Sequence, residues 1–174
     1  VFAVSLGLFS VFLDSTIVNV SLPVIMKDYN IDLHLASWII NAFVLTLAIC
    51  LITLGKLADI FGRIKLFLVG VIIFALSSFL CGIAPSIEIL IASRVLQGIA
   101  GAMIIPTSMM LVRTAVPPKK TGLAMGVWGA VGALAVAIGP SIGGLLTEYI
   151  HWRWIFYINV PIIIVSYPFL LWSF

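Results

Sequence analysis

Charged residues are scarce in this sequence. Only 9% of its 174 residues are Asp, Glu, Lys or Arg, whereas 63% are hydrophobic, and the mean hydropathy is +1.31. Soluble domains contain roughly 45–50% apolar residues. The lack of charge therefore excludes an ordinary soluble domain and predicts a membrane protein, with no basis for nucleic-acid binding.

Reactive and metal-binding residues are also few, with two cysteines and two histidines. Cys50 and Cys81 fall inside apolar runs, where isolated thiols act as small apolar residues. His34 and His151 have no second ligand nearby, so we expect no metal site and no cofactor. No HExxH or GxSxG motif is present, which disfavours an enzyme.

Long apolar runs occupy most of the chain. Runs of about 20 residues match a hydrocarbon core roughly 30 Å thick, and they must be helical because unpaired backbone groups are unstable in lipid. The first run carries Asp14 and Asn19 in its middle and lacks a cleavage pattern, so it is a span rather than a signal peptide. Short loops predict one compact all-α integral membrane bundle. We expect six transmembrane helices, at residues 2–26, 37–57, 66–84, 87–112, 122–147 and 154–172.

The basic residues are unevenly distributed between these spans. By the positive-inside rule, the loops that carry most of them face the cytoplasm. This places the N-terminus and residue 174 in the cytoplasm, with Lys27 and Arg153 on the outer side. Six of the nine basic residues lie on the cytoplasmic side: Lys56, Arg63, Lys65, Arg113, Lys119 and Lys120.

Aromatic residues mark the outer ends of the spans. The segment "HWRWIFYINVP" begins at His151 and contains Trp152 and Trp154, and Trp38 lies at a matching level. Tryptophan is enriched at membrane interfaces. We therefore expect these tryptophans to be interfacial anchors.

Asp14 lies deep in the first span. It stands 13 residues before Lys27, or roughly 20 Å from the span end at about 1.5 Å per residue. Burial disfavours the charged form of a carboxyl, so such a group can take up protons near physiological pH, as a proton carrier must. The alternative is a structural carboxyl that hydrogen-bonds Thr or Asn across a helix contact.

Arg94 lies in the fourth span, with Gln97, Gly98 and Gly101 on the same helical stripe. This face should meet another helix or a cavity. Arg94 is roughly 10 Å deep by the same count of about 1.5 Å per residue, so its depth differs from that of Asp14 and argues against a direct ion pair. The alternative is a structural arginine satisfied by backbone carbonyls.

The fifth span is rich in small residues. In "GVWGAVGALAVAIGPSIGGLL", residues 126–146, Gly139 and Gly143 form a GxxxG pair, and Pro140 should bend the helix. The run lacks the Lys-Ser/Thr of a phosphate loop. Plain helix packing and a role in gating remain equally open.

The two halves of the chain share a weak pattern. Asp14 is followed by Pro23 in the first span, and Arg94 by Pro106 in the fourth. Transporters contain such triplets as inverted repeats with binding sites near the midplane. We therefore expect a 3+3 inverted repeat.

Five stretches together resemble one family, the major facilitator superfamily, and within it the fourteen-helix drug:proton antiporter branch. "GKLADIFGRIK" (55–65) is similar to the cytoplasmic loop motif of the superfamily, and "RVLQGIAGA" (94–102) to its fourth-helix motif. "GPSIGG" (139–144) resembles the fifth-helix antiporter motif. "LDSTIVNVSLP" (13–23) and "WRWIFYINVP" (152–161) resemble stretches typical of the drug:proton branch.

The resemblance implies roles for particular residues. Asp14 would serve in proton or cation coupling and Arg94 in proton relay. Asp59 would latch the cytoplasmic gate together with Arg113, and can pair with Arg63 at i+4; positive residues that only hold the loop inside are the alternative. Ile60 and Ile64 depart from the family pattern, which has basic residues there. The gate would comprise Gly55, which allows close helix approach, Asp59, Gly62, Arg63 and Arg113, and the antiporter bend Gly139, Pro140, Gly143 and Gly144.

The function implied by the resemblance is a secondary active multidrug exporter in the cell membrane. It would exchange protons for lipophilic or cationic compounds by alternating access, driven by the proton gradient. A C-terminal half, absent from this chain, would complete the cavity, so we expect the chain alone not to transport. A proton-coupled metabolite importer of the same superfamily and a six-helix scaffold that oligomerises through its GxxxG faces are the alternatives.

Overall fold

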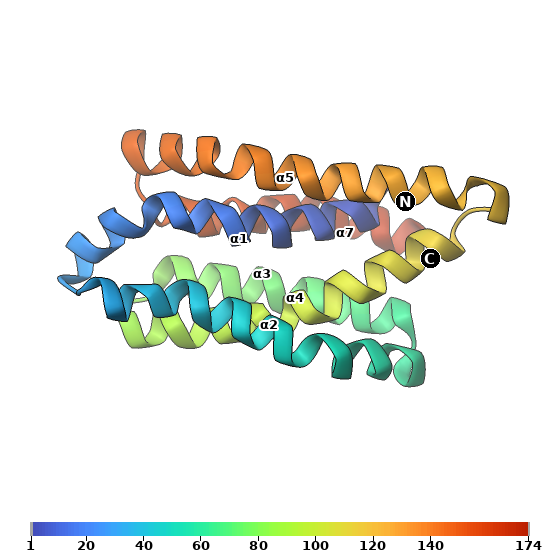
Figure 1. Ribbon diagram of the computed structural model, residues 1–174, viewed down its shortest axis with the longest axis horizontal. Coiled ribbons are helices and arrows are strands. Elements are labelled where there is room, and N and C mark those ends of the chain that lie inside the picture. Colours follow the sequence, from blue (N-terminus) through green and yellow to red (C-terminus); the bar gives the residue numbers. More distant parts are fainter. Residues whose placement is uncertain (1, 174) are drawn as a thin grey trace.

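The computed structural model describes residues 2–173, with side chains described from residue 4 to residue 168. The described chain is helical throughout apart from short connections, and Figure 1 shows its long helices running side by side. The elements are α1 (Phe2–Tyr29), α2 (Leu33–Phe61), α3 (Arg63–Ile83), α4 (Ile87–Thr114), η1 (Pro118–Lys120), α5 (Thr121–Tyr149), α6 (Trp154–Tyr157) and α7 (Asn159–Ser173).

Within the described residues, 5 helices are long and apolar enough to cross a membrane. The expected sixth span corresponds to α6 and α7, which are separated only by Ile158. The backbone of Ile158 is helical (φ −61°, ψ −27°), and its N–H donates to the Trp154 carbonyl at 3.0 Å. Pro161 has no N–H to donate to the carbonyl of Tyr157 four residues earlier, so α6 and α7 follow one another with one helical hydrogen bond missing. The described helices are those of a multi-pass membrane protein.

Short connections join the antiparallel helices. Asp32 caps α2 by accepting a hydrogen bond from the backbone N–H of Leu35 at 3.0 Å. Gly62 alone separates α2 from α3 and has a φ of 97°. Because side chains disfavour this region, glycine is the residue best suited to the junction.

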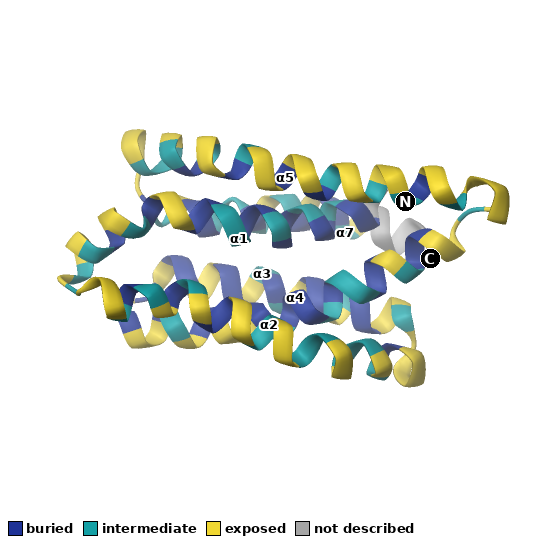
Figure 2. Cartoon of the chain, in the orientation of Figure 1, coloured by how far each residue is buried: buried dark blue, intermediate teal, exposed yellow. Residues whose placement is uncertain are grey.

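The helices pack as two groups. α4 packs mainly against α2 and α3, while α1 packs mainly against α5 and α7. In Figure 1, α5 and α1 lie together, and α2, α3 and α4 lie below them. Figure 2 shows that burial concentrates on the inner helices, whereas α2 and α5 are exposed along much of their length. The functional side chains described below lie where the two groups meet.

Candidate functional site

Asp14 and Arg94 form a direct ion pair inside the bundle. The guanidinium Nη1 of Arg94 donates to Asp14 Oδ2, and both side chains are almost fully buried, at 1% and 0% exposure. The expectation from depth that they would not meet was wrong. Counting residues from the span ends assumed that all helices end at one level, but the α1–α2 connection extends beyond the start of α4 (Figure 1).

Arg94 has further partners besides Asp14. Its Nε donates to the backbone carbonyl of Ile39 on α2 at 2.9 Å, and Nη1 donates to Gln97 Oε1 at 2.7 Å. Its guanidinium carbon lies 4.4 Å from the centre of the Phe43 ring, a cation–π contact. A buried cation needs such a shell of acceptors to be stable, and α1, α2 and α4 all contribute to it.

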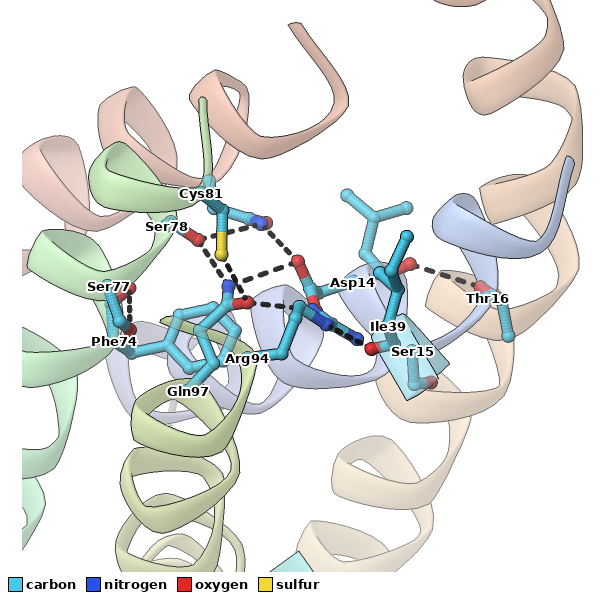
Figure 3. A network of polar contacts seen from close by, with 12 residues as sticks. Asp14, Ser15, Thr16, Ile39, Phe74, Ser77, Ser78, Cys81, Arg94 and Gln97 are labelled. Atoms are coloured by element: carbon cyan, nitrogen blue, oxygen red, sulfur yellow. Dashed lines mark hydrogen bonds and ion pairs between the residues drawn. The ribbon is translucent and has the colours of Figure 1, made fainter. Parts of the chain in front are cut away.

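Asp14 accepts two amide hydrogen bonds in addition to that of Arg94. Gln97 Nε2 donates to Asp14 Oδ1 at 3.2 Å, and Asn159 Nδ2 donates to the same oxygen at 3.0 Å. All three partners donate, so both oxygens of Asp14 act as acceptors. Figure 3 shows the Gln97 amide between Ser78 and Asp14, with Arg94 on the other side of the carboxylate.

Three members of this site were not predicted. Ser78 Oγ accepts from Gln97 Nε2 at 2.6 Å and from Asn159 Nδ2 at 3.2 Å. Cys81 donates to Gln97 Oε1 at 3.4 Å, so it is more than a small apolar residue. The available signal for Asn159 was an isolated amide in an apolar run two residues before a proline, which would have made it a candidate for a buried contact.

The two glycines of the stripe predicted beside Arg94 on α4 allow close helix packing. A Cβ added at Gly98 would lie 2.7 Å from the backbone oxygen of Phe43 and 2.8 Å from Thr46 Cβ. At Gly101 it would meet Leu47 Cδ1 at 3.1 Å. Small residues here allow α4 to approach α2 closely, which brings Arg94 within reach of Ile39.

The residues of the expected cytoplasmic gate gather around one cavity. Arg63 donates to Asp59 Oδ1 from Nη2 at 2.9 Å and from Nε at 3.0 Å, the expected i,i+4 pair across the Gly62 junction. A cavity of about 430 Å³ is lined by Gly55, Asp59, Arg63 and Arg113, among others. Gly55 was expected to allow a close helix approach. Within this chain it does not, because a Cβ there would lie 3.7 Å from Pro106.

The glycines of the fifth-helix motif face α1. A Cβ at Gly139 would overlap the Thr16 hydroxyl, and one at Gly143 would lie 2.7 Å from the Ile17 carbonyl oxygen. Gly144 has more room, with Val20 at 3.8 Å, and Pro140 is exposed within the continuous helix α5. The GxxxG face is therefore used inside the chain, which removes the basis for oligomerisation through it.

The aromatic segment 151–161 lies at the end of the bundle opposite the Asp59–Arg63 pair. One of its tryptophans, Trp152, is not the interfacial anchor that was predicted. Trp38 and Trp154 are about half exposed, but Trp152 is 1% exposed. Its indole N–H donates to Asp28 Oδ2 at 2.9 Å, so Trp152 is a core residue and not an interfacial anchor. Arg153 Nη1 donates to the carbonyls of Gly82 and Ala84, both at 2.8 Å, where α3 ends. Cations stabilise helix C-termini, so this arginine ties the α5–α6 connection to α3.

No cluster suited to a metal ion lies in the described part of the chain. Groups of three or more His, Cys, Asp or Glu side chains are not found there. The buried polar site instead combines the carboxylate of Asp14 and the guanidinium of Arg94 with two amides, the Ser78 hydroxyl and the Cys81 thiol. The thiol donates to an amide oxygen, which is not a base that would activate it.

The sequence matches the Major Facilitator Superfamily over residues 4–174. The chain belongs to this superfamily. It is 44% identical over 160 residues to the tetracenomycin C resistance and export protein of Streptomyces glaucescens, covering 92% of this chain and 30% of that protein. It is also 44% identical over 160 residues to the multidrug export protein EmrB of Haemophilus influenzae, covering 92% and 31% of the two chains.

A solved structure shares the fold of this superfamily member. A bacterial homologue of the human lysosomal transporter Spinster, in an inward-facing and occupied conformation, matches with a TM-score of 0.74 and 21% identity. The match covers 95% of this chain and 42% of that one. The chain thus spans about a third of the length of the curated relatives it matches.

Proposed function

We propose that this chain is the N-terminal six-helix part of a secondary active exporter that exchanges protons for lipophilic or cationic compounds. The single observation that supports this most is the buried Asp14, held by Arg94, Gln97 and Asn159 between membrane helices. Ionisable residues in such positions are costly and are usually functional. The names of the relatives, which include drug resistance and multidrug export proteins, favour export over uptake of a metabolite.

The mechanism follows from the hydrogen bonds of Asp14. As a carboxylate it pairs with Arg94, which joins α1 to α4. A proton on Asp14 cancels its charge and weakens that pair, so Arg94 has to rely on the Ile39 carbonyl and Gln97. Protonation would therefore loosen the contact between the two groups of helices, and a bound cation could promote release of the proton through its charge.

The cytoplasmic gate is the second part of the proposal. Asp59 and Arg63 lie at the α2–α3 junction, and Arg113 lines the same cavity. We propose that this surface, with Gly55 and Gly62, closes against the C-terminal half on the cytoplasmic side, and that the fifth-helix residues Gly139, Pro140, Gly143 and Gly144 supply a bend during transport. In this proposal the full transporter has fourteen helices, resides in the cell membrane, has a cytoplasmic N-terminus and needs no cofactor besides the proton gradient.

Efflux by the full-length transporter tests the function. Inside-out vesicles are energised with a proton gradient, and uptake of a fluorescent lipophilic cation is followed for the parent and for Asp14→Asn. We expect the parent to transport and the variant to lose proton-driven transport while still inserting normally, since an amide cannot carry the proton.

Ser77→Ala is the matched control for this experiment. Ser77 is buried one residue from the site, but its hydroxyl bonds the Phe74 carbonyl of its own helix. It should transport like the parent. Equal transport by the parent and Asp14→Asn would contradict the coupling role, and transport in the opposite direction would indicate an importer.

A further inference from the structure

The Asn159 side chain is fully buried but has one atom without a partner. Its Nδ2 donates to Asp14 Oδ1 at 3.0 Å and to Ser78 Oγ at 3.2 Å. Among the described side chains, its Oδ1 is the buried polar atom with no hydrogen bond. A buried carbonyl oxygen without a hydrogen-bond partner is energetically unfavourable. The other buried polar side-chain atoms of this site all have partners.

The polar groups around Asp14 are arranged for its ionised form. Arg94, Gln97 and Asn159 all donate to the carboxylate. A protonated Asp14 instead carries an O–H that needs an acceptor. Gln97 Oε1 already accepts from Arg94 at 2.7 Å and from Cys81 at 3.4 Å, and the Ile39 carbonyl accepts from Arg94. The unused acceptor at the site is therefore Asn159 Oδ1.

We propose that the Asn159 carboxamide reverses when Asp14 takes up a proton. In the ionised state both N–H groups donate, one to Asp14 and one to Ser78. After reversal, the carbonyl oxygen accepts from the protonated Asp14 and from the Ser78 hydroxyl, using both of its lone pairs. The NH2 group takes the place of Oδ1, where the described side chains offer it no acceptor. The reversed state therefore costs two unpaired N–H groups and is populated only while the O–H of Asp14 needs an acceptor. Asn159 is then a positioning residue whose amide orientation depends on whether Asp14 is protonated. This inference rests on the proposed proton-coupled function.

Few other titratable groups face this exchange. Arg94 comes from α4 and the Cys81 thiol from α3, whereas the described parts of α2 and α7 contribute only the Ile39 carbonyl and the Asn159 amide. Of these groups, Asp14 is the one that bonds Asn159 directly, whereas the Cys81 thiol bonds Gln97. A pH response of Asn159 would thus be tied to Asp14 by direct contact.

The position of Asn159 connects this exchange to the backbone. It is the first residue of α7, and Pro161, two residues later, leaves the carbonyl of Tyr157 without its helical hydrogen bond. A helix bends most readily at such a proline. The reversal would therefore pass the protonation state of α1 to the place where α6 meets α7.

Nuclear magnetic resonance of the full-length transporter tests the inference. The protein is labelled with ¹⁵N at asparagine side chains and ¹³C at aspartate carboxyls, and both are followed across a pH titration in lipid nanodiscs. Signals are assigned with Asp14→Asn and Asn159→Leu, or with Asn159→Ser if the leucine variant does not fold. We expect the Asn159 amide signals to shift with the same midpoint as the Asp14 carboxyl and to stay fixed in Asp14→Asn.

Asn19 is an internal control, because its amide donates to the Ser15 carbonyl of its own helix and should not respond. If Asp14 titrates while the Asn159 signals do not move, the inference is overturned and the proposed function stands. If the Asp14 carboxyl does not titrate, both are overturned.

A transport measurement gives a second readout. Asn159→Leu removes a donor to the charged form, which favours protonation of Asp14, and the acceptor for the neutral form, which opposes it. The bond to the charged form is the stronger of the two. The pH dependence of efflux should therefore move to higher pH, by at most roughly tenfold in proton concentration. Ser166→Ala is the control, because Ser166 is buried on the same helix but bonds the Ile163 carbonyl within it. An unchanged pH profile in Asn159→Leu would contradict the proposal.

Discussion

Arg94 is held in the bundle by its ion pair and by the hydrogen bonds that it donates to acceptors on α1, α2 and α4. Its ion pair with Asp14 is shielded from solvent, unlike that of Arg63 and Asp59, whose side chains are 36% and 58% exposed. A buried charge that loses its partner is strongly destabilising, whereas an exposed pair contributes little. The two pairs in this chain therefore allow a direct comparison.

We predict that Arg94→Gln and Asp14→Asn each lower the stability of the folded transporter by about 3–5 kcal/mol, because each leaves one charge buried without its partner. The double variant should cost clearly less than the sum of the two. Thermal unfolding in detergent measures all four proteins. The same set of single and double variants at the exposed pair, Arg63→Gln and Asp59→Asn, should give a coupling energy of about 1 kcal/mol or less. If the losses of stability at Asp14 and Arg94 were additive, the account would be contradicted.

At this scale the sequence predicted the charged members of the site but not the connections between them. Asp14, Arg94 and Gln97 stood out because polar residues are rare in apolar spans. Their meeting could not be predicted, since it depends on how far α1 extends beyond α4. Ser78 and Asn159 gave weak signals, because one neutral polar residue in a span is compatible with a bond inside its own helix, as Ser77 shows.

The contact between α1 and α5 depends on the absence of side chains at two positions of α5. A Cβ at Gly143 would lie 2.7 Å from the backbone oxygen of Ile17, three residues from Asp14. Backbone atoms cannot move aside without moving the helix. The spacing of α5 from α1 is thus set close to the polar site.

We predict that Gly143→Ala lowers the melting temperature of the full-length transporter and reduces efflux, because α1 and α5 must separate. Gly129→Ala is the control in the interior of the same helix: no heavy atom lies within 4 Å of its added Cβ, and alanine favours a helix by about 0.8–1.0 kcal/mol over glycine in a helix interior. The control should be neutral or slightly stabilising. A Gly143→Ala protein that melts and transports like the control would refute the role of this contact.

Local irregularities were harder to predict than helices. The sixth span was expected at 154–172, and the structure describes α6 and α7 there with Ile158 between them, still in helical conformation. Pro161 explains this irregularity, because it cannot donate to the Tyr157 carbonyl. A proline in a span does not by itself predict such a change of element, since α4 continues through Pro106 and α5 through Pro140.

At the scale of the whole molecule, the polar site joins the two groups of helices. Asp14 and Asn159 belong to α1 and α7, whereas Arg94, Gln97 and Ser78 belong to α4 and α3. The charge on one carboxyl therefore affects contacts across the bundle. This gives a physical route by which a proton could favour one arrangement of the helices over another.

Substrate-induced proton release tests this central claim most directly. The purified full-length transporter is placed in weakly buffered detergent solution at a pH where Asp14 is protonated, and a lipophilic cation is added while the pH is recorded. The account predicts that the parent and Ser77→Ala release protons on binding, and that Asp14→Asn binds the cation without releasing them. Equal proton release from Asp14→Asn and the parent would contradict it.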